Sequence, residues 1–207
     1  SKDQSYVLYC LTQNQLAHTL FPLGGMTKAE IRLIAEDAGL VNARKPDSQD
    51  ICFVPDGDYA GFIERRSPGK TKSGDFIDAQ GNKIGTHRGI THYTIGQRRG
   101  IATAFGKPMY VAAKDAKNNT VTLGENHELS TPELVARDLN LIAVEKIDSP
   151  MRVTAKIRYN QKDQGALLLP GADNSVIVRF DEPQRAVAPG QAVVFYQGER
   201  VIGGGTI

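Results

Sequence analysis

The stretch GALLLPGADNSVIVRF, residues 165–180, contains two short apolar segments on either side of the turn-forming residues Pro170-Gly171-Ala172-Asp173. Short strands separated by such turns are typical of all-β folds. The same pattern recurs along the rest of the C-terminal part, so that six strands are predicted in all, at 139–142, 152–159, 165–169, 175–180, 191–196 and 200–203. So many short strands in so short a segment predict a small closed barrel over 129–207, because closure removes exposed sheet edges.

Residues 68–128 are expected to form a small β-rich central domain. The segments 76–78 and 83–85 flank a turn at 79–82, and the segments 109–113 and 120–123 flank 114–119. Each pair predicts a β-hairpin. A connection rich in Gly, Pro and Ser at 67–74 separates this domain from the residues before it.

Residues 1–67 are predicted to be helical. Thr27-Lys28-Ala29-Glu30 is a capping box, and apolar residues then follow at helical spacing until Gly39. Shorter helices are expected at 5–11, 13–19 and 58–65. A few helices without a partner layer make a poor independent domain. We therefore expect 1–67 to be the C-terminal part of a larger domain, with exposed apolar surface, and the chain as a whole to have an α+β fold.

The composition is that of a soluble globular protein, with 40% apolar and 23% charged residues among 207. No stretch approaches the ~20 apolar residues of a membrane helix, and the N-terminus does not resemble a signal peptide. The two cysteines, Cys10 and Cys52, form neither a disulfide framework nor a zinc motif. A reduced, cytoplasmic location without a metal site is therefore expected.

One stretch, 79–114, contains no acidic residue. Its cations are Lys83, Arg88, Arg98, Arg99, Lys107 and Lys114. If they share a face they would attract phosphates, whereas the alternative is a solvated surface balanced by acids elsewhere in the fold. His87 and His92 lie in the same stretch, but no third ligand has the spacing of a metal site, so RNA-backbone contact or structural hydrogen bonding is expected of them.

Several segments, in the order of the chain, point to one family. They are KDQSY (2–6), FPLG (21–24), KPDSQDICF (45–53), GTHRG (85–89), YTIGQRRG (93–100), AKIRY (155–159), PGQAVVFY (189–196) and GGG (203–205). Together they resemble the tRNA 2-thiouridylases and cover nearly the whole chain. The SQDICF and YTIGQRR segments are the most specific, since a short Gly/Lys/Arg string alone proves little.

The resemblance implies a three-domain fold with an N-terminal α/β nucleotide-binding domain, of which 1–67 would be the helical end, a small central domain and a C-terminal β-barrel. It also implies ATP-dependent replacement of O2 by sulfur in the wobble uridine of tRNA, with ATP and Mg²⁺ as cofactors. ATP would adenylate the carbonyl oxygen, and a cysteine persulfide would then supply sulfur. The implied partners are tRNA and a sulfur-relay protein or cysteine desulfurase.

Two interpretations of Cys52 are open. On the residues alone it is a small buried hydrophobe between Ile51 and Phe53. The neighbouring Asp47 and Asp50 oppose formation of a thiolate unless Lys45 or Arg44 offsets them. The resemblance instead implies that Cys52 is the catalytic residue that carries the persulfide. A persulfide ionises more readily than a thiol, so the acidic neighbours matter less once sulfur is loaded.

The resemblance and the charge pattern also predict residues that contact tRNA. They are Lys2, Asp3, Gln4, Arg98, Arg99, Arg158, Tyr159 and Gln191. An arginine can bind a phosphate or base, and a tyrosine can stack on a base. The alternatives are a plain helix start at 2–4, a surface charge beside a packed aromatic at 158–159, and a residue that merely follows a turn at 191.

The family's ATP-binding loop, of the form SGGVDS, does not occur in this sequence, nor does the first catalytic cysteine of that region. Cys10, in Tyr9-Cys10-Leu11, does not match that cysteine and is expected to be core packing. We therefore expect this chain to be a fragment that does not complete thiolation alone. A non-catalytic RNA-binding module is the alternative. A thiol-redox protein is disfavoured because nothing pairs Cys10 with Cys52.

Overall fold

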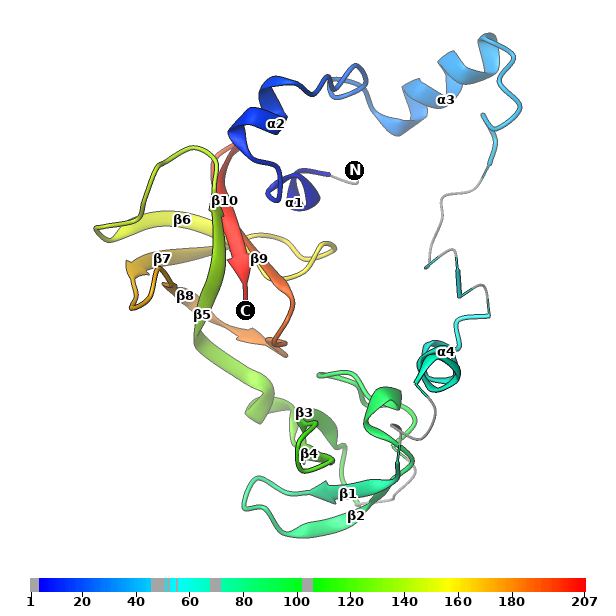
Figure 1. The fold of residues 1–207 in the computed structure, drawn as a ribbon, viewed down its shortest axis with the longest axis vertical. Coiled ribbons are helices and arrows are strands. Elements are labelled where there is room, and N and C mark those ends of the chain that lie inside the picture. The colour runs from blue at the N-terminus through cyan, green and yellow to red at the C-terminus, as the bar shows by residue number, and fades with distance from the viewer. Residues whose placement is uncertain (1–3, 46–50, 52, 55, 68–71, 102–105) are drawn as a thin grey trace.

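The computed structural model describes residues 4–45, 51, 53–54, 56–67, 72–101 and 106–207. A helical N-terminal segment, a small sheet and a barrel follow one another along the chain (Figure 1). The helices are α1 (Ser5–Leu8), α2 (Gln13–Ala17), α3 (Lys28–Asp37) and α4 (Tyr59–Arg66). The predicted helices and the α+β fold class are confirmed, although α1 ends earlier than expected.

Helix α3 begins and ends as its sequence predicts. The Thr27 hydroxyl accepts the Glu30 N–H at 3.4 Å, and the Glu30 carboxylate accepts the Thr27 N–H at 2.6 Å. At the other end Gly39 has a φ of +67°, a left-handed conformation that glycine adopts without a Cβ penalty. The capping box and the glycine stop are both confirmed.

The central sheet contains β1 (Gly74–Ile77), β2 (Lys83–His87), β3 (Tyr110–Asp115) and β4 (Thr120–Gly124). Its order is β2-β1-β4-β3, so the two predicted hairpins are confirmed and a parallel β1–β4 pair joins them. Buried apolar side chains from β1, β3 and β4, together with Tyr93, form its core.

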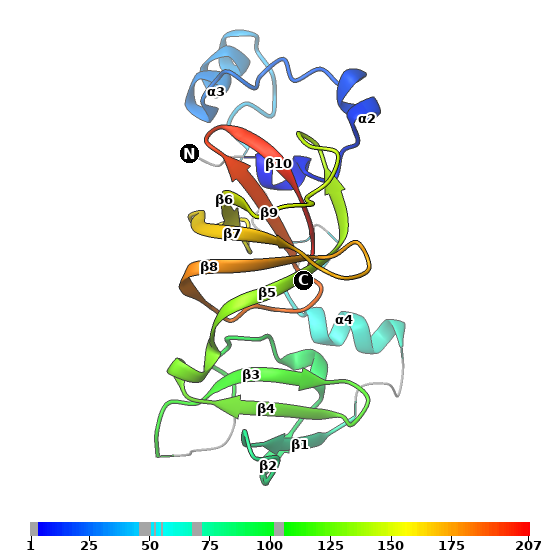
Figure 2. The same ribbon diagram turned by 90° about the vertical axis from the view of Figure 1, so that its left-hand side faces the viewer.

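The C-terminal part forms the predicted closed barrel (Figure 2). Its strands are β5 (Ser130–Leu141), β6 (Met151–Lys156), β7 (Gln164–Pro170), β8 (Val176–Arg185), β9 (Ala192–Gln197) and β10 (Arg200–Thr206), closed in the order β10-β5-β8-β7-β6-β9. Alternate residues point inward, among them Val153, Ala155 and Ile157, all at most 5% exposed. Strands β5 and β8 are longer than the sequence predicted.

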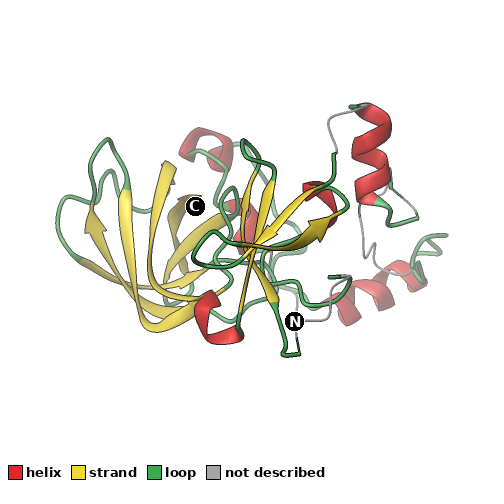
Figure 3. Cartoon of the chain, turned by 90° about the horizontal axis from the view of Figure 1, so that it is seen from below, coloured by secondary structure: helices red, strands yellow, loops and turns green. Residues whose placement is uncertain are grey.

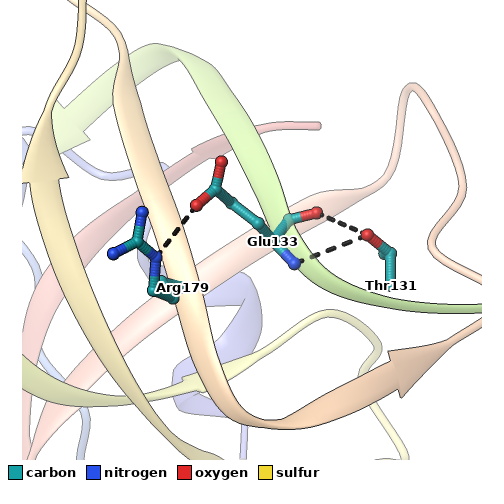
Figure 4. Close-up of polar contacts among 3 residues, drawn as sticks. All are labelled: Thr131, Glu133 and Arg179. Carbon is teal, nitrogen blue, oxygen red and sulfur yellow. Dashed lines mark hydrogen bonds and ion pairs between the residues drawn. The ribbon is translucent and has the colours of Figure 1, made fainter.

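The extra length of β5 and β8 contains an irregularity. The register shifts between Thr131 and Glu133, around a proline that has no N–H to donate. The Thr131 hydroxyl donates to the Glu133 carbonyl at 2.9 Å, and Arg179 Nε donates to the Glu133 carboxylate at 3.1 Å (Figure 4). Beyond the shift, Ser130 pairs with Arg185, so the ends of both strands extend toward the central sheet.

Large apolar side chains of the helical segment are exposed. Leu20 is 90% exposed, Leu33 67% and Ile34 53%, and in Figure 3 the helices on the right-hand side of the picture lie apart from the strands. In α3, the apolar face that the sequence predicts therefore has no partner layer among the described residues. The prediction of exposed apolar surface on this segment is confirmed.

Candidate nucleic-acid interface

Helix α1 lies against the barrel. The Tyr6 hydroxyl donates to the Ala192 carbonyl of β9 at 2.8 Å. The Tyr9 ring lies over Gly204 of β10 so closely that a Cβ there would be 2.6 Å from Tyr9 Cδ2. The Asn140 side-chain amide donates to the Leu11 carbonyl at 3.0 Å. We call this contact region the α1–barrel seam.

Four of the residues predicted to contact tRNA lie around Tyr6 in the seam. Gln4 is exposed at the start of α1, two residues before Tyr6, and Gln191 is exposed next to Ala192. The Tyr159 ring lies edge-on to the Tyr6 ring, with centroids 6.1 Å apart. Arg158 is exposed and its Nη2 donates to the Ala186 carbonyl at 2.7 Å. Residues far apart in the sequence therefore share one surface.

Burial in the seam raises the pKa of Tyr6 to about 12, and the phenols of Tyr9 and Tyr196 add to the increase. The nearby Arg158 guanidinium acts in the opposite direction. Tyr6 is therefore a neutral hydrogen-bond donor at neutral pH. The Tyr196 ring, 6% exposed, lies under α1, and the Lys156 ammonium is 5.4 Å from its centroid.

A second group of predicted residues lies on the loop 94–99 of the central domain. Its backbone is fixed internally, because the Gln97 side chain accepts the Thr94 N–H at 2.9 Å and donates to the Arg99 carbonyl at 2.8 Å. Gly96 has a φ of +87° and its N–H donates to Val111 of β3 at 2.8 Å. Arg98 and Arg99 are exposed on this braced loop and make no ion pair with a described residue.

Two other cations of the acid-free stretch form ion pairs, and a third donates to a backbone carbonyl. Lys83 pairs with Asp75 at 2.6 Å, and Lys107 pairs with Glu125 at 2.5 Å. The Lys114 ammonium donates to the Tyr93 carbonyl at 2.7 Å. For Lys83 and Lys107 the structure favours the alternative of a surface balanced by acids from elsewhere in the fold.

His87 has a structural role. It is 1% exposed and packs against the rings of Phe76 and Tyr93, which also contact each other. Its Nε2 lies 3.1 Å from the Asn119 carbonyl, and its Nδ1 accepts the Gly89 N–H. Among the described residues no group of three or more His, Cys, Asp and Glu side chains could hold a metal.

Of the two cysteines, Cys10 alone lies within the described residues. Cys52, like Lys2 and Asp3, lies outside the described residues. Cys10 is exposed and its thiol donates to the Val7 carbonyl at 3.0 Å, so the prediction that Cys10 is core packing is wrong. The helix expected over 5–11 ends at Leu8, which leaves Cys10 in a turn at the surface.

Sequence reasoning missed Tyr6 as the centre of the seam and Arg185 between the two domains. Tyr6 belongs to the KDQSY segment, but a phenol on a short helix also fits plain core packing. Arg185 lies in no segment that the sequence distinguished.

Three family models match consecutive parts of the chain. They describe a tRNA methyl transferase HUP domain over 1–56, a tRNA methyl transferase PRC-barrel domain over 60–125 and an aminomethyltransferase β-barrel domain over 131–207. The chain is also similar over its whole length to curated proteins named tRNA-specific 2-thiouridylase MnmA. Identity is 55% to that of Acetivibrio thermocellus and 52% to that of Treponema denticola.

The chain belongs to the tRNA-specific 2-thiouridylase family. A relative from Thermoanaerobacter pseudethanolicus is 54% identical over 207 residues. The chain spans 57% of the length of that relative and of the one from Acetivibrio thermocellus, and 58% of the one from Treponema denticola. The family resemblance that the segments predicted is therefore confirmed. Among the described residues, no helix is both long and apolar enough to span a membrane.

Proposed function

We propose that the chain is the tRNA-holding and sulfur-carrying part of a tRNA 2-thiouridylase. The observation that carries this proposal is the convergence of Gln4, Arg158, Tyr159 and Gln191 around Tyr6. An exposed guanidinium beside a half-buried tyrosine ring fits RNA, because arginine binds phosphates and bases and a tyrosine ring stacks on an unpaired base. The names of the relatives supply the substrate class.

A second cationic site would bind the backbone of the same tRNA. Arg98 and Arg99 extend from a loop whose own backbone is braced, so contact with phosphates would cost little ordering of that loop. Sequence-independent attraction of phosphates positions an RNA, and the base contacts at Arg158 and Tyr159 would orient it. Such a tRNA-modifying protein would act in the cytoplasm.

Cys52 would carry the sulfur that is transferred. The Cys52 thiolate would take the outer sulfur of a donor persulfide, which leaves the donor as a thiol and Cys52 as a persulfide. The terminal sulfur would then form a bond to C2 of the uracil as the activated O2 departs. A second thiol from outside this chain would break the S–S bond by forming a disulfide with Cys52, and the sulfur would stay on C2. The flanking Ile51 and Phe53 are 45% and 64% exposed. In the family ATP with Mg²⁺ activates the uracil oxygen. No SGGVDS segment occurs here, so we assign ATP no residues of this chain and derive no step from it.

Transfer of labelled sulfur from a cysteine desulfurase system to the purified protein tests this proposal. Wild type and Cys10→Ser, the matched control at the other cysteine, should acquire a reductant-labile label. Cys52→Ser should not. Equal labelling of wild type and Cys52→Ser would remove sulfur transfer from the proposal and leave the alternative, a non-catalytic RNA-binding module.

A further inference from the structure

Three consecutive residues at the end of β8 contact both parts of the proposed tRNA surface. Gln184 and Ala186 face the barrel: the Gln184 amide oxygen accepts from Gln161 at 2.7 Å, and the Ala186 carbonyl accepts from Arg158. The residue between them, Arg185, faces the central domain. The segment that carries Arg158 and Tyr159 is thus held by the same strand end that contacts the central domain.

Arg185 contacts three separate elements of the central domain and its connection. Its Nε donates to Asn126 Oδ1 at 2.9 Å, and its Nη2 lies 3.5 Å from the Gly96 carbonyl. Its guanidinium carbon is 5.2 Å from the centroid of the Tyr110 ring. A planar guanidinium can make divergent hydrogen bonds and a ring contact together, which a lysine ammonium cannot reproduce.

The contact with Gly96 is close enough to determine position. A Cβ on Gly96 would lie 2.8 Å from the Ala186 Cβ and 3.4 Å from Arg185 Nη1. Gly96 directly precedes Gln97, which braces the loop that carries Arg98 and Arg99. Ala186 is 3% exposed, has a φ of +56°, and its N–H donates to the Leu129 carbonyl at 2.8 Å, so this corner of the barrel is itself fixed.

We propose that Arg185 is a positioning residue that holds the loop 94–99 and the Arg158–Tyr159 segment as one composite tRNA-binding surface. The inference rests on the proposed function. Two groups of contacts held at a fixed separation bind one rigid RNA together, because the second contact forms without further loss of freedom. If the contacts of Arg185 are weakened, both groups of tRNA contacts remain, but their relative motion must be frozen each time tRNA binds, which weakens binding.

The test compares tRNA binding by wild type, Arg185→Lys and Asn126→Ala. Arg185→Lys keeps the positive charge but removes the planar guanidinium with its divergent donors. Asn126→Ala removes the side-chain oxygen that accepts from Arg185 and leaves Arg185 in place. Both should weaken tRNA binding by about five-fold, the lower range of coupling between sites, with little change in the salt dependence. Arg179→Lys, on the same strand but paired with Glu133, is the matched control and should bind like wild type.

A further variant, Arg185→Ala, distinguishes a direct phosphate contact by Arg185. In that case Arg185→Lys and Asn126→Ala would bind like wild type, and only Arg185→Ala would weaken binding and reduce the salt dependence. Hydrogen exchange without RNA supplies the second readout, since weakening of the Arg185 contacts should speed exchange around Leu129 and Ala186 in both Arg185→Lys and Asn126→Ala. Wild-type affinity in both Arg185→Lys and Asn126→Ala would overturn this inference alone. Absence of tRNA binding by wild type would overturn the proposed function, and this inference with it.

Discussion

At the level of single residues, Tyr6 links the helical segment to the barrel. Its hydroxyl donates to Ala192 and its ring contacts Tyr159, so it joins the helical segment to two predicted tRNA contacts. The sequence predicted the contacts at 158, 159 and 191 through the resemblance. It could not predict that they surround Tyr6, because that depends on how α1 lies across β9.

The raised pKa of Tyr6 gives a prediction for alkaline pH. Because its pKa is about 12 in the folded chain and 10.0 ordinarily, its contribution to stability is complete below pH 10 and is lost as the pH rises toward 12. Thermal unfolding should therefore show a smaller loss of Tm over this pH range in Tyr6→Phe than in wild type. Tyr159→Phe, the same substitution on the neighbouring ring, should follow wild type. Parallel curves for Tyr6→Phe and wild type would contradict the assignment.

At the level of elements, the sequence predicted those whose local signals agree. The capping box and Gly39 bound α3, and turn residues separate the barrel strands. The misjudged elements depend on tertiary contacts. Strand β5 begins at Ser130 because it pairs with the end of β8, and α1 ends at Leu8, where Asn140 binds the Tyr9 and Leu11 carbonyls.

The close approach of α1 to β10 predicts the effect of one methyl group. In Gly204→Ala the new Cβ would lie 2.6 Å from both the Val193 carbonyl oxygen and Tyr9 Cδ2, so strand or helix must shift. Overpacking of this kind should lower the free energy of unfolding by about 1–3 kcal/mol in denaturant titrations. At Gly25 nothing lies within 4 Å, so Gly25→Ala is the control and should unfold at the wild-type midpoint. Equal denaturant midpoints for Gly204→Ala and Gly25→Ala would contradict the close packing around Gly204.

At the level of the whole molecule, the chain joins two separate cationic sites through one corner of the barrel. The sequence predicted both sites, one from the acid-free stretch and one from the resemblance. It did not predict which cations of that stretch remain available, because Asp75 and Glu125, the partners of Lys83 and Lys107, lie outside it. Nor could it predict the corner at Arg185, where residues 96, 126 and 158 meet only in the folded chain.

The salt dependence of tRNA binding tests the central claim, that this surface holds tRNA, most directly. The slope of log K against log salt is negative, and each phosphate contact that is removed should reduce its magnitude by about 1. The double variant Arg98→Ala/Arg99→Ala should therefore reduce the magnitude by about 2. Lys83→Ala/Lys107→Ala removes the same number of charges from the same stretch, but from ion-paired positions, and should leave the slope nearly unchanged. Equal slopes for the arginine variant and wild type, or equal losses in the two double variants, would contradict the account.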